Sequence, residues 1–250
     1  MEFKTFCKHS CATYQEFRLN HELFNKFYEI TNNQQETILS IPDGCVNIWF
    51  LWKNGKCQAR LIGSALAGKP SLVSNYEKCF GIKFNAGVVP EVFLNDIGIL
   101  ISNNLLMQKY QSISFIEKEI EKISTFEEKV MYFLDRDLLF GRNQVNQLTI
   151  SIVQEVKACM GNVKITELAG RTEYSRHRLN EIFRQNIGMS IKQYSGIIRI
   201  QQAIYGVETK NIDFIYEELG YYDQSHFIRD FKRYTLLTPN RFMGSEWSFT

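Results

Sequence analysis

The feature that most constrains this chain is a pattern of two short helices separated by a tight turn, over residues 217–233. Gly220 supplies the turn, and Asp223 stands where a helix N-cap is expected, because its short side-chain oxygen can accept a backbone N–H. Phe227 and Phe231 then form one apolar stripe, while amide, hydroxyl and guanidinium groups occupy the rest of the helix surface. Such a helix suits the major groove of DNA, so the segment predicts a helix-turn-helix.

The same pattern occurs further upstream. Residues 165–170 are expected to form a short amphipathic helix, residues 172–174 a turn, and Ser175 a second N-cap. The helix that follows is expected to end at Gly188, as a C′ glycine commonly ends a helix. A continuous helix over residues 190–207 would be roughly 27 Å long. It could hold two reading helices about one DNA turn apart, ~34 Å.

The residues that make up the two units and their connection form one larger pattern. They are Leu168, Ala169, Ser175, Leu179, Ile182, Phe183, Gly188, Tyr194, Arg199, Ala203, Gly220, Tyr221, Gln224, Ser225, His226, Phe227, Phe231, Lys232, Arg233, Thr238 and Pro239. This set resembles the DNA-binding domain of the AraC/XylS family of bacterial transcription regulators. Two residues depart from the family pattern, since Leu236 stands where glycine is usual and Tyr216 where a small residue is usual. Both departures are expected to alter local packing and not the DNA face.

The resemblance implies binding of double-stranded DNA, activation of transcription and work with RNA polymerase. We expect base contacts from His177, Arg178, Asn180, Glu181, Gln224, Ser225 and Arg229, at positions that match base-reading positions of the family. We expect phosphate contacts from Arg176, Arg184, Lys232 and Arg233, aided by backbone N–H groups at the two helix starts. The identities of the base-reading side chains differ from those of other members, so the resemblance does not give the operator sequence.

Composition sets the frame for the rest of the chain. A length of 250 residues permits one large domain or two ordinary ones, and 44% hydrophobic and 14% aromatic residues are enough for a hydrophobic core. The net charge is only +2, which by itself says little about nucleic acid. The excess lies from Ile150 on, with 13 Lys/Arg against 11 Asp/Glu, and such a local excess suits DNA recognition by placed contacts better than a broad basic coat. Six cysteines show no paired spacing, and the first residues lack the apolar stretch of a signal peptide. We therefore expect a soluble cytoplasmic protein with reduced thiols.

Between residues 37 and 84 the pattern is that of β-strands. Residues 37–41, 45–51, 57–63 and 76–84 are predicted strands, and Asn54-Gly55 is a good hairpin turn. These segments predict a small antiparallel barrel or sandwich. The residues Pro42-Asp43-Gly44-Cys45 and Phe80-Gly81-Ile82-Lys83-Phe84 resemble the N-terminal sensing domain of one branch of the same regulators. Residues 1–40 contain a polar loop at 31–35 but give no firm assignment otherwise.

A sensing domain needs a ligand pocket, and its candidate lining residues are Asp43, Cys45, Trp49, Lys83 and Phe84. The alternative is that the aromatic residues among them belong to the core. A metalloenzyme of the cupin type needs clustered histidines, and no histidine lies between residues 25 and 176. Cys7, His9 and Cys11 alternate along the chain but lack the fourth ligand of a structural zinc site. We expect no metal and no other cofactor.

Residues 92–138 change to a helical period. The segments 115–123 and 126–138 predict an antiparallel helix pair, which could form a homodimer surface or simply cover the barrel. Residues 141–144 are the best linker sequence. The expected organisation is an N-terminal sensing or dimerisation domain over residues 1–140, a linker over 141–146 and a DNA-binding domain over 147–250.

The overall prediction is an α+β protein: a β-barrel or sandwich with a helical pair, followed by an all-α domain with two helix-turn-helix motifs. The N-terminal domain could bind an effector or serve only assembly. A DNA-tethered enzyme is not expected, because the sequence shows no Ser/His/Asp arrangement, phosphate-binding glycine loop or metal set. A thiol redox sensor built on Asp43 and Cys45 is a further alternative.

Overall fold

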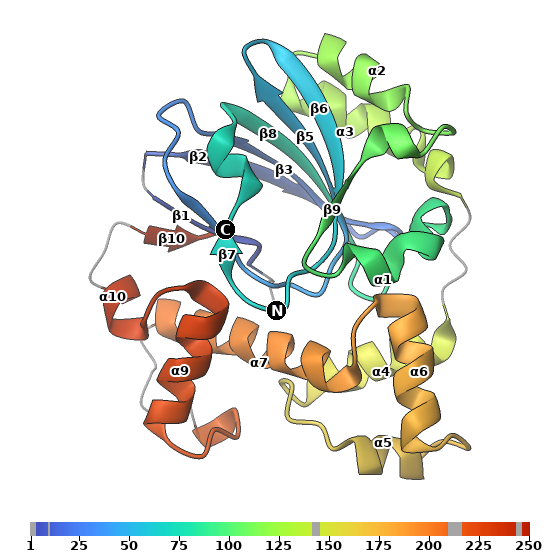
Figure 1. The fold of residues 1–250 in the computed structure, drawn as a ribbon, viewed down its shortest axis with the longest axis vertical. Helices are drawn as coiled ribbons and strands as arrows, with labels where there is room; N and C mark the ends of the chain where they lie inside the picture. The colour runs from blue at the N-terminus through green and yellow to red at the C-terminus, as the bar shows by residue number, and fades with distance from the viewer. Residues whose placement is uncertain (1–3, 10, 142–145, 210–216, 244–246) are drawn as a thin grey trace.

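The computed structural model describes residues 4–9, 11–141, 146–209, 217–243 and 247–250. The N-terminal half contains two antiparallel sheets with helices against them, and the C-terminal half is helical (Figure 1). This arrangement confirms the predicted fold class.

The larger sheet has six strands in the order β2-β3-β8-β5-β6-β9. They are β2 (Thr13–Arg18), β3 (Phe24–Thr31), β8 (Lys78–Phe84), β5 (Asn47–Lys53), β6 (Lys56–Ile62) and β9 (Asn104–Leu106). The hairpin between β5 and β6 turns at Asn54 and Gly55, which have φ values of 51° and 73°. The predicted Asn-Gly turn is therefore confirmed, because both positions adopt the positive φ that such turns require.

The smaller sheet brings together distant parts of the chain. Its order is β10-β1-β4-β7, from β10 (Trp247–Phe249), β1 (Phe6–His9), β4 (Ile38–Ser40) and β7 (Lys69–Pro70). β10 pairs antiparallel with β1, with Cys7 opposite Phe249. The carboxy-terminal end of the chain therefore returns to the N-terminal sheet (Figure 1).

The two faces of the larger sheet serve different cores. Phe27, Phe50 and Phe80 place their rings 6.3, 5.7 and 6.1 Å from that of Phe133 in α3 (Phe126–Leu134). Their neighbours Tyr28, Trp49, Leu51 and Cys79 belong to a separate buried cluster with Phe6 of β1. This alternation follows from the period of two along a strand. The pair formed by α2 (Ile116–Lys122) and α3 therefore covers the sheet, and it still leaves Met131 54% exposed.

Short helical turns connect these elements. They are η1 (Leu72–Asn75), η2 (Glu91–Asp96), α1 (Ile97–Leu100), η3 (Met107–Lys109) and η4 (Asp137–Phe140). Residues 142–145 of the expected linker lie outside the described residues.

The helical half contains α4 (Gln147–Ala158), α5 (Ile165–Gly170), α6 (Arg176–Ile187), α7 (Ile191–Glu208), α9 (Gln224–Thr235) and α10 (Pro239–Met243). Three predicted helix ends are confirmed. Ser175 caps α6 and Asp223 caps α9, each by accepting a backbone N–H three residues on, and Gly188 ends α6 with φ 84°. Of the short helix expected just before Gly220, Glu217 and Glu218 are helical, and Tyr216 lies outside the described residues.

The two halves share contacts along α7. The side chain of Gln201 is fully buried. It accepts a hydrogen bond from the Lys4 N–H and donates to the carbonyl oxygens of Lys4 and Pro42, each at 2.7 Å. Gly44 lies so close to Tyr194 that a Cβ would come 2.5 Å from its ring. No helix among the described residues is long and apolar enough to span a membrane.

Candidate nucleic-acid interface

The two predicted reading helices stand at opposite ends of α7. In Figure 1, α9 and α6 flank the two ends of α7 and extend past it, away from the sheets. Their C-terminal ends contact the N-terminal half: a Cβ on Gly188 would lie 2.7 Å from the Ile97 carbonyl oxygen, and the Gly68 N–H donates to the Arg233 carbonyl oxygen at 3.0 Å. Their N-terminal ends therefore point away from the rest of the protein, as groove-entering helices require.

The burial pattern of both helices is the one predicted. Leu179 and Phe183 in α6, and Phe227 and Phe231 in α9, are buried. The exposed residues are Arg176, His177, Arg178, Glu181 and Arg184 on α6, and Gln224, Ser225, Arg229, Lys232 and Arg233 on α9. Every predicted contact residue except Asn180 is therefore exposed in this conformation.

Asn180 is half-buried, and its amide is engaged at both ends. Its Nδ2 donates to the Arg176 carbonyl oxygen at 3.1 Å, and its Oδ1 accepts the Ile191 N–H at 3.2 Å. The second bond satisfies a free N–H in the first turn of α7. A base contact by Asn180 would require these bonds to open, so the structure gives this residue a role in joining α6 to α7.

Two exposed residues of α6 pair with each other. Arg178 Nη1 lies 2.7 Å from Glu181 Oε2. The hydrogen bond and charge of Arg178 lower the pKa of Glu181, which keeps that carboxylate ionised. In α9, His226 lies 3.9 Å from Asp230, and its ring meets the Tyr221 ring edge-on at 5.2 Å. Sequence reasoning did not assign this contact.

A groove of about 1540 Å³ separates the two reading helices. The facing sides of α6 and α9 form its walls, and α7 contributes Lys192, Gln193, Gly196 and Arg199. Counting lysines, arginines and carboxylates, the lining has five cations (Arg176, Arg184, Lys192, Arg199, Arg233) and two acids (Glu181, Asp230). The surface between the helices therefore carries a local positive excess.

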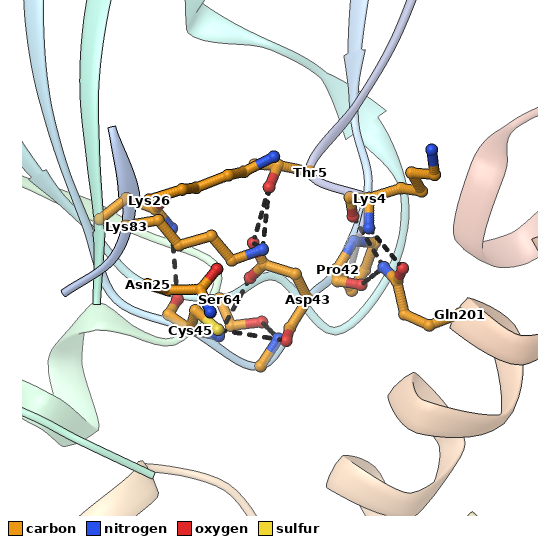
Figure 2. A network of polar contacts seen from close by, with 12 residues as sticks. Lys4, Thr5, Asn25, Lys26, Pro42, Asp43, Cys45, Ser64, Lys83 and Gln201 are labelled. Atoms are coloured by element: carbon orange, nitrogen blue, oxygen red, sulfur yellow. Dashed lines mark hydrogen bonds and ion pairs between the residues drawn. The ribbon is translucent and has the colours of Figure 1, made fainter. Parts of the chain in front are cut away.

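Three of the predicted effector residues, Asp43, Cys45 and Lys83, lie together at the junction of the two halves. Asp43 accepts from Lys83 at 2.8 Å, from Thr5 at 3.0 Å and from the Cys45 N–H at 3.0 Å (Figure 2). Burial alone would lower the pKa of Lys83, but the charge of Asp43 outweighs it and the pKa is raised. Burial, with Asp43 beside it, raises the pKa of Cys45 to about 12. Lys83 therefore forms a buried ion pair with Asp43.

The two aromatic candidates are core residues. Phe84 lies in a cluster with Phe24, Phe93 and Phe140, and the Trp49 indole N–H donates to the Tyr28 hydroxyl at 2.5 Å. Asp43 and Trp49 do line a cavity between the sheets, but its volume is only about 50 Å³, space for a water molecule or two.

A larger cavity, of about 220 Å³, lies between the N-terminal half and α4 and was not predicted. Its lining includes Arg18, Lys26 and Lys157. Burial, with the charge of Lys83 next, lowers the pKa of Lys26 to about 8, although Glu16 lies 2.8 Å away and opposes the shift. These three cations come from β2, β3 and α4, so no spacing in the sequence could have grouped them.

Comparison with known proteins decides the class of the helical half. A family model described as a helix-turn-helix domain matches residues 168–245, the segment that holds α6, α7 and α9. The chain carries an AraC-type helix-turn-helix domain. This confirms the resemblance drawn from the sequence.

Two curated relatives match part of the chain. An uncharacterized HTH-type transcriptional regulator of Haemophilus influenzae is 28% identical over 116 residues, which is 45% of this chain. The Msm operon regulatory protein of Streptococcus mutans is 27% identical over 104 residues, or 39% of this chain. The chain covers only 38% and 37% of the lengths of these two proteins.

Solved structures of ToxT from Vibrio cholerae align along nearly the whole chain. One is 14% identical and covers 96% of this chain and 98% of ToxT, with a TM-score of 0.44. ToxT bound to (E)-4-(8-methylnaphthalen-1-yl)but-3-enoic acid gives the same TM-score and identity. The sequence identity and the TM-score are too low to transfer any property of ToxT to the present chain.

Proposed function

We propose that this chain is a sequence-specific DNA-binding transcription regulator that acts as an activator in the bacterial cytoplasm, working with RNA polymerase. The observation that carries the proposal is the pair of helices, α6 and α9, which expose polar and cationic faces at opposite ends of α7. At roughly 27 Å, α7 is of the length that places two such helices in neighbouring major-groove segments. One chain would then read both segments on one side of the duplex.

The exposed side chains divide by chemistry into two contact classes. We propose base contacts from His177, Arg178, Glu181, Gln224, Ser225 and Arg229, and phosphate contacts from Arg176, Arg184, Lys232 and Arg233. Asn180 would join the base contacts only if its hydrogen bonds to Arg176 and Ile191 open. Arginine can bind guanine through two hydrogen bonds, and such a pair discriminates between bases by about 1–3 kcal/mol. Lysine binds phosphate as a point charge and carries no sequence information.

Selection of bound duplexes from random DNA by the purified protein tests the proposal. Enriched sequences should contain two conserved blocks about one helical turn apart. Replacing Arg229 by Ala should weaken binding and relax the preference at one base pair, whereas Lys232→Ala should lower the salt dependence by about one ion at every sequence. Absence of any enriched sequence would refute the proposal.

For the N-terminal half we propose effector binding, homodimerisation, or both. Three cations and no carboxylate are among the lining residues of the cavity at α4, and this local positive excess favours an anionic ligand there over an apolar one. The sequence predicted an effector pocket at Asp43, Cys45, Trp49, Lys83 and Phe84. Of these residues, Cys45 lines the cavity at α4. Exposed Met131 on α3 supports a dimer through the helical pair. Calorimetric titration with sulfate tests effector binding. Sedimentation of the wild-type protein and of the Met131→Lys variant tests homodimerisation.

A further inference from the structure

The first half of α7, the helix between the two reading helices, has an accessible strip that lies in the groove. In the first half of α7, residues 191, 194, 195, 197, 198 and 200 are buried. Lys192 and Gln193 are exposed, and Gly196 and Arg199 are half-exposed. All four line the groove between α6 and α9. Their spacing of about one and two helical turns places them on a single face.

This strip has unused polar capacity. Lys192 makes no ion pair among the described residues. Ser195, also in the groove lining, is 6% exposed, and its Oγ has no hydrogen-bond partner there. The Nε of Arg199 is likewise buried without a partner, although Nη2 donates to the Gly161 carbonyl oxygen at 3.1 Å. Buried polar groups normally have partners, so these atoms point to a polar ligand in the groove.

The shape of the strip favours a long, narrow anion. Gly196 has no side chain, and its neighbour is the Tyr234 hydroxyl, which a Cβ would approach to 2.7 Å. No side chain of residue 196 therefore fills the groove between Lys192 and Arg199. These two residues lie seven positions, or roughly 10 Å, apart along the helix axis. This length corresponds to about three phosphates of one DNA strand, at 3.4 Å of rise each.

We propose that the strip formed by Lys192, Gln193, Gly196 and Arg199 binds the DNA backbone that runs between the two major-groove segments, with Lys192 as its principal phosphate contact. The inference rests on the proposed function. When α6 and α9 enter neighbouring major grooves, the intervening backbone faces the floor of the groove between them. This contact holds the DNA at a third point, midway between the contacts of α6 and α9. It would weaken binding to DNA in which the distance between the two recognised segments is changed.

The test compares Lys192→Gln with the wild-type protein on the selected duplex over a range of salt. Glutamine keeps the helix propensity and much of the length of lysine, so folding should be retained. The slope of log K against log salt should fall by about 0.9, which makes the loss of affinity from 50 to 200 mM salt ~3.5-fold smaller. Lys122→Gln, on exposed α2, is the matched control and should leave the slope unchanged.

A second measurement locates the contact. Duplexes in which single spacer phosphates are replaced by neutral methylphosphonates should weaken binding of the wild-type protein at one or two positions, and the Lys192→Gln protein should be insensitive at those positions. A slope equal to that of the Lys122→Gln protein, or equal sensitivity of both proteins at every spacer phosphate, overturns the inference. Since Arg229→Ala would still relax sequence preference in that case, the proposed function would stand. If no protein selects any sequence, both proposals fail together.

Discussion

Gln201 is the side chain whose removal should reveal most clearly how the two halves are joined. It lies on α7, is fully inaccessible, and makes three hydrogen bonds of 2.7 Å to backbone groups of Lys4 and Pro42. In Gln201→Ala these backbone groups lose their partners. A net value of about 1 kcal/mol for each bond gives a loss of ~3 kcal/mol in the free energy of unfolding.

Urea unfolding, followed by circular dichroism and by tryptophan fluorescence, measures this loss. With an m value of about 3 kcal/mol per molar, the midpoint should fall by ~1 M. The control is Gln185→Ala, which removes the same atoms from an exposed position of α6 and should change the stability by no more than about 0.5 kcal/mol. Sequence preference in DNA binding should persist in both variants. Equal midpoints for the two would refute the reasoning that Gln201 holds the halves together.

Three further predictions concern the cap of α9, the cavity and the thiols. Leu236→Gly should raise the free energy of unfolding by roughly 0.5–1 kcal/mol, because Leu236 has φ 64° and a left-handed non-glycine residue costs about 1–2 kcal/mol, partly offset by the greater freedom of glycine in the unfolded chain; a lower melting temperature would contradict this. Sulfate binding in the cavity should be strongest below pH 8 and weaken as the pH rises through 8, because Lys26 loses its charge near its pKa of about 8; an affinity that is constant up to pH 9.5 would exclude Lys26. Exposed Cys11 should react with a thiol reagent in the native protein, whereas Cys45, with a pKa of about 12, should react only after unfolding; rapid labelling of native Cys45 would revive the redox alternative.

The local elements of the helical half could be predicted because their signals are local. Ser175, Asp223 and Gly188 act on backbone groups within a few residues, so their cap roles can be read directly from the sequence. The unusual Leu236 is also explained. It ends α9 in the left-handed conformation, which is why glycine is usual there in the family it resembles.

The N-terminal sheets were only partly predictable, because strand pairing depends on distant partners. Residues 1–40 contain β1, β2, β3 and β4, but these strands pair in part with β7, β8 and β10, which come later in the chain. Nothing near Trp247 indicates that it should pair with His9, at the other end of the chain. The cationic cavity and the Gln201 contacts could not be predicted for the same reason, because each brings together segments that are far apart in sequence.

The positions of the two reading helices depend on more than the helix that connects them. α6 ends at Gly188 against Ile97 of α1, and the last turn of α9 accepts a hydrogen bond from Gly68, so both helices touch the N-terminal half at their C-terminal ends. β10 provides a third connection between the two halves, because it pairs with β1. Next to it, the Thr5 and Phe6 N–H groups both donate to the Thr250 carbonyl oxygen. The contacts at Gly68 and Ile97 therefore help to fix the C-terminal ends of the two reading helices from outside the helix-turn-helix units themselves.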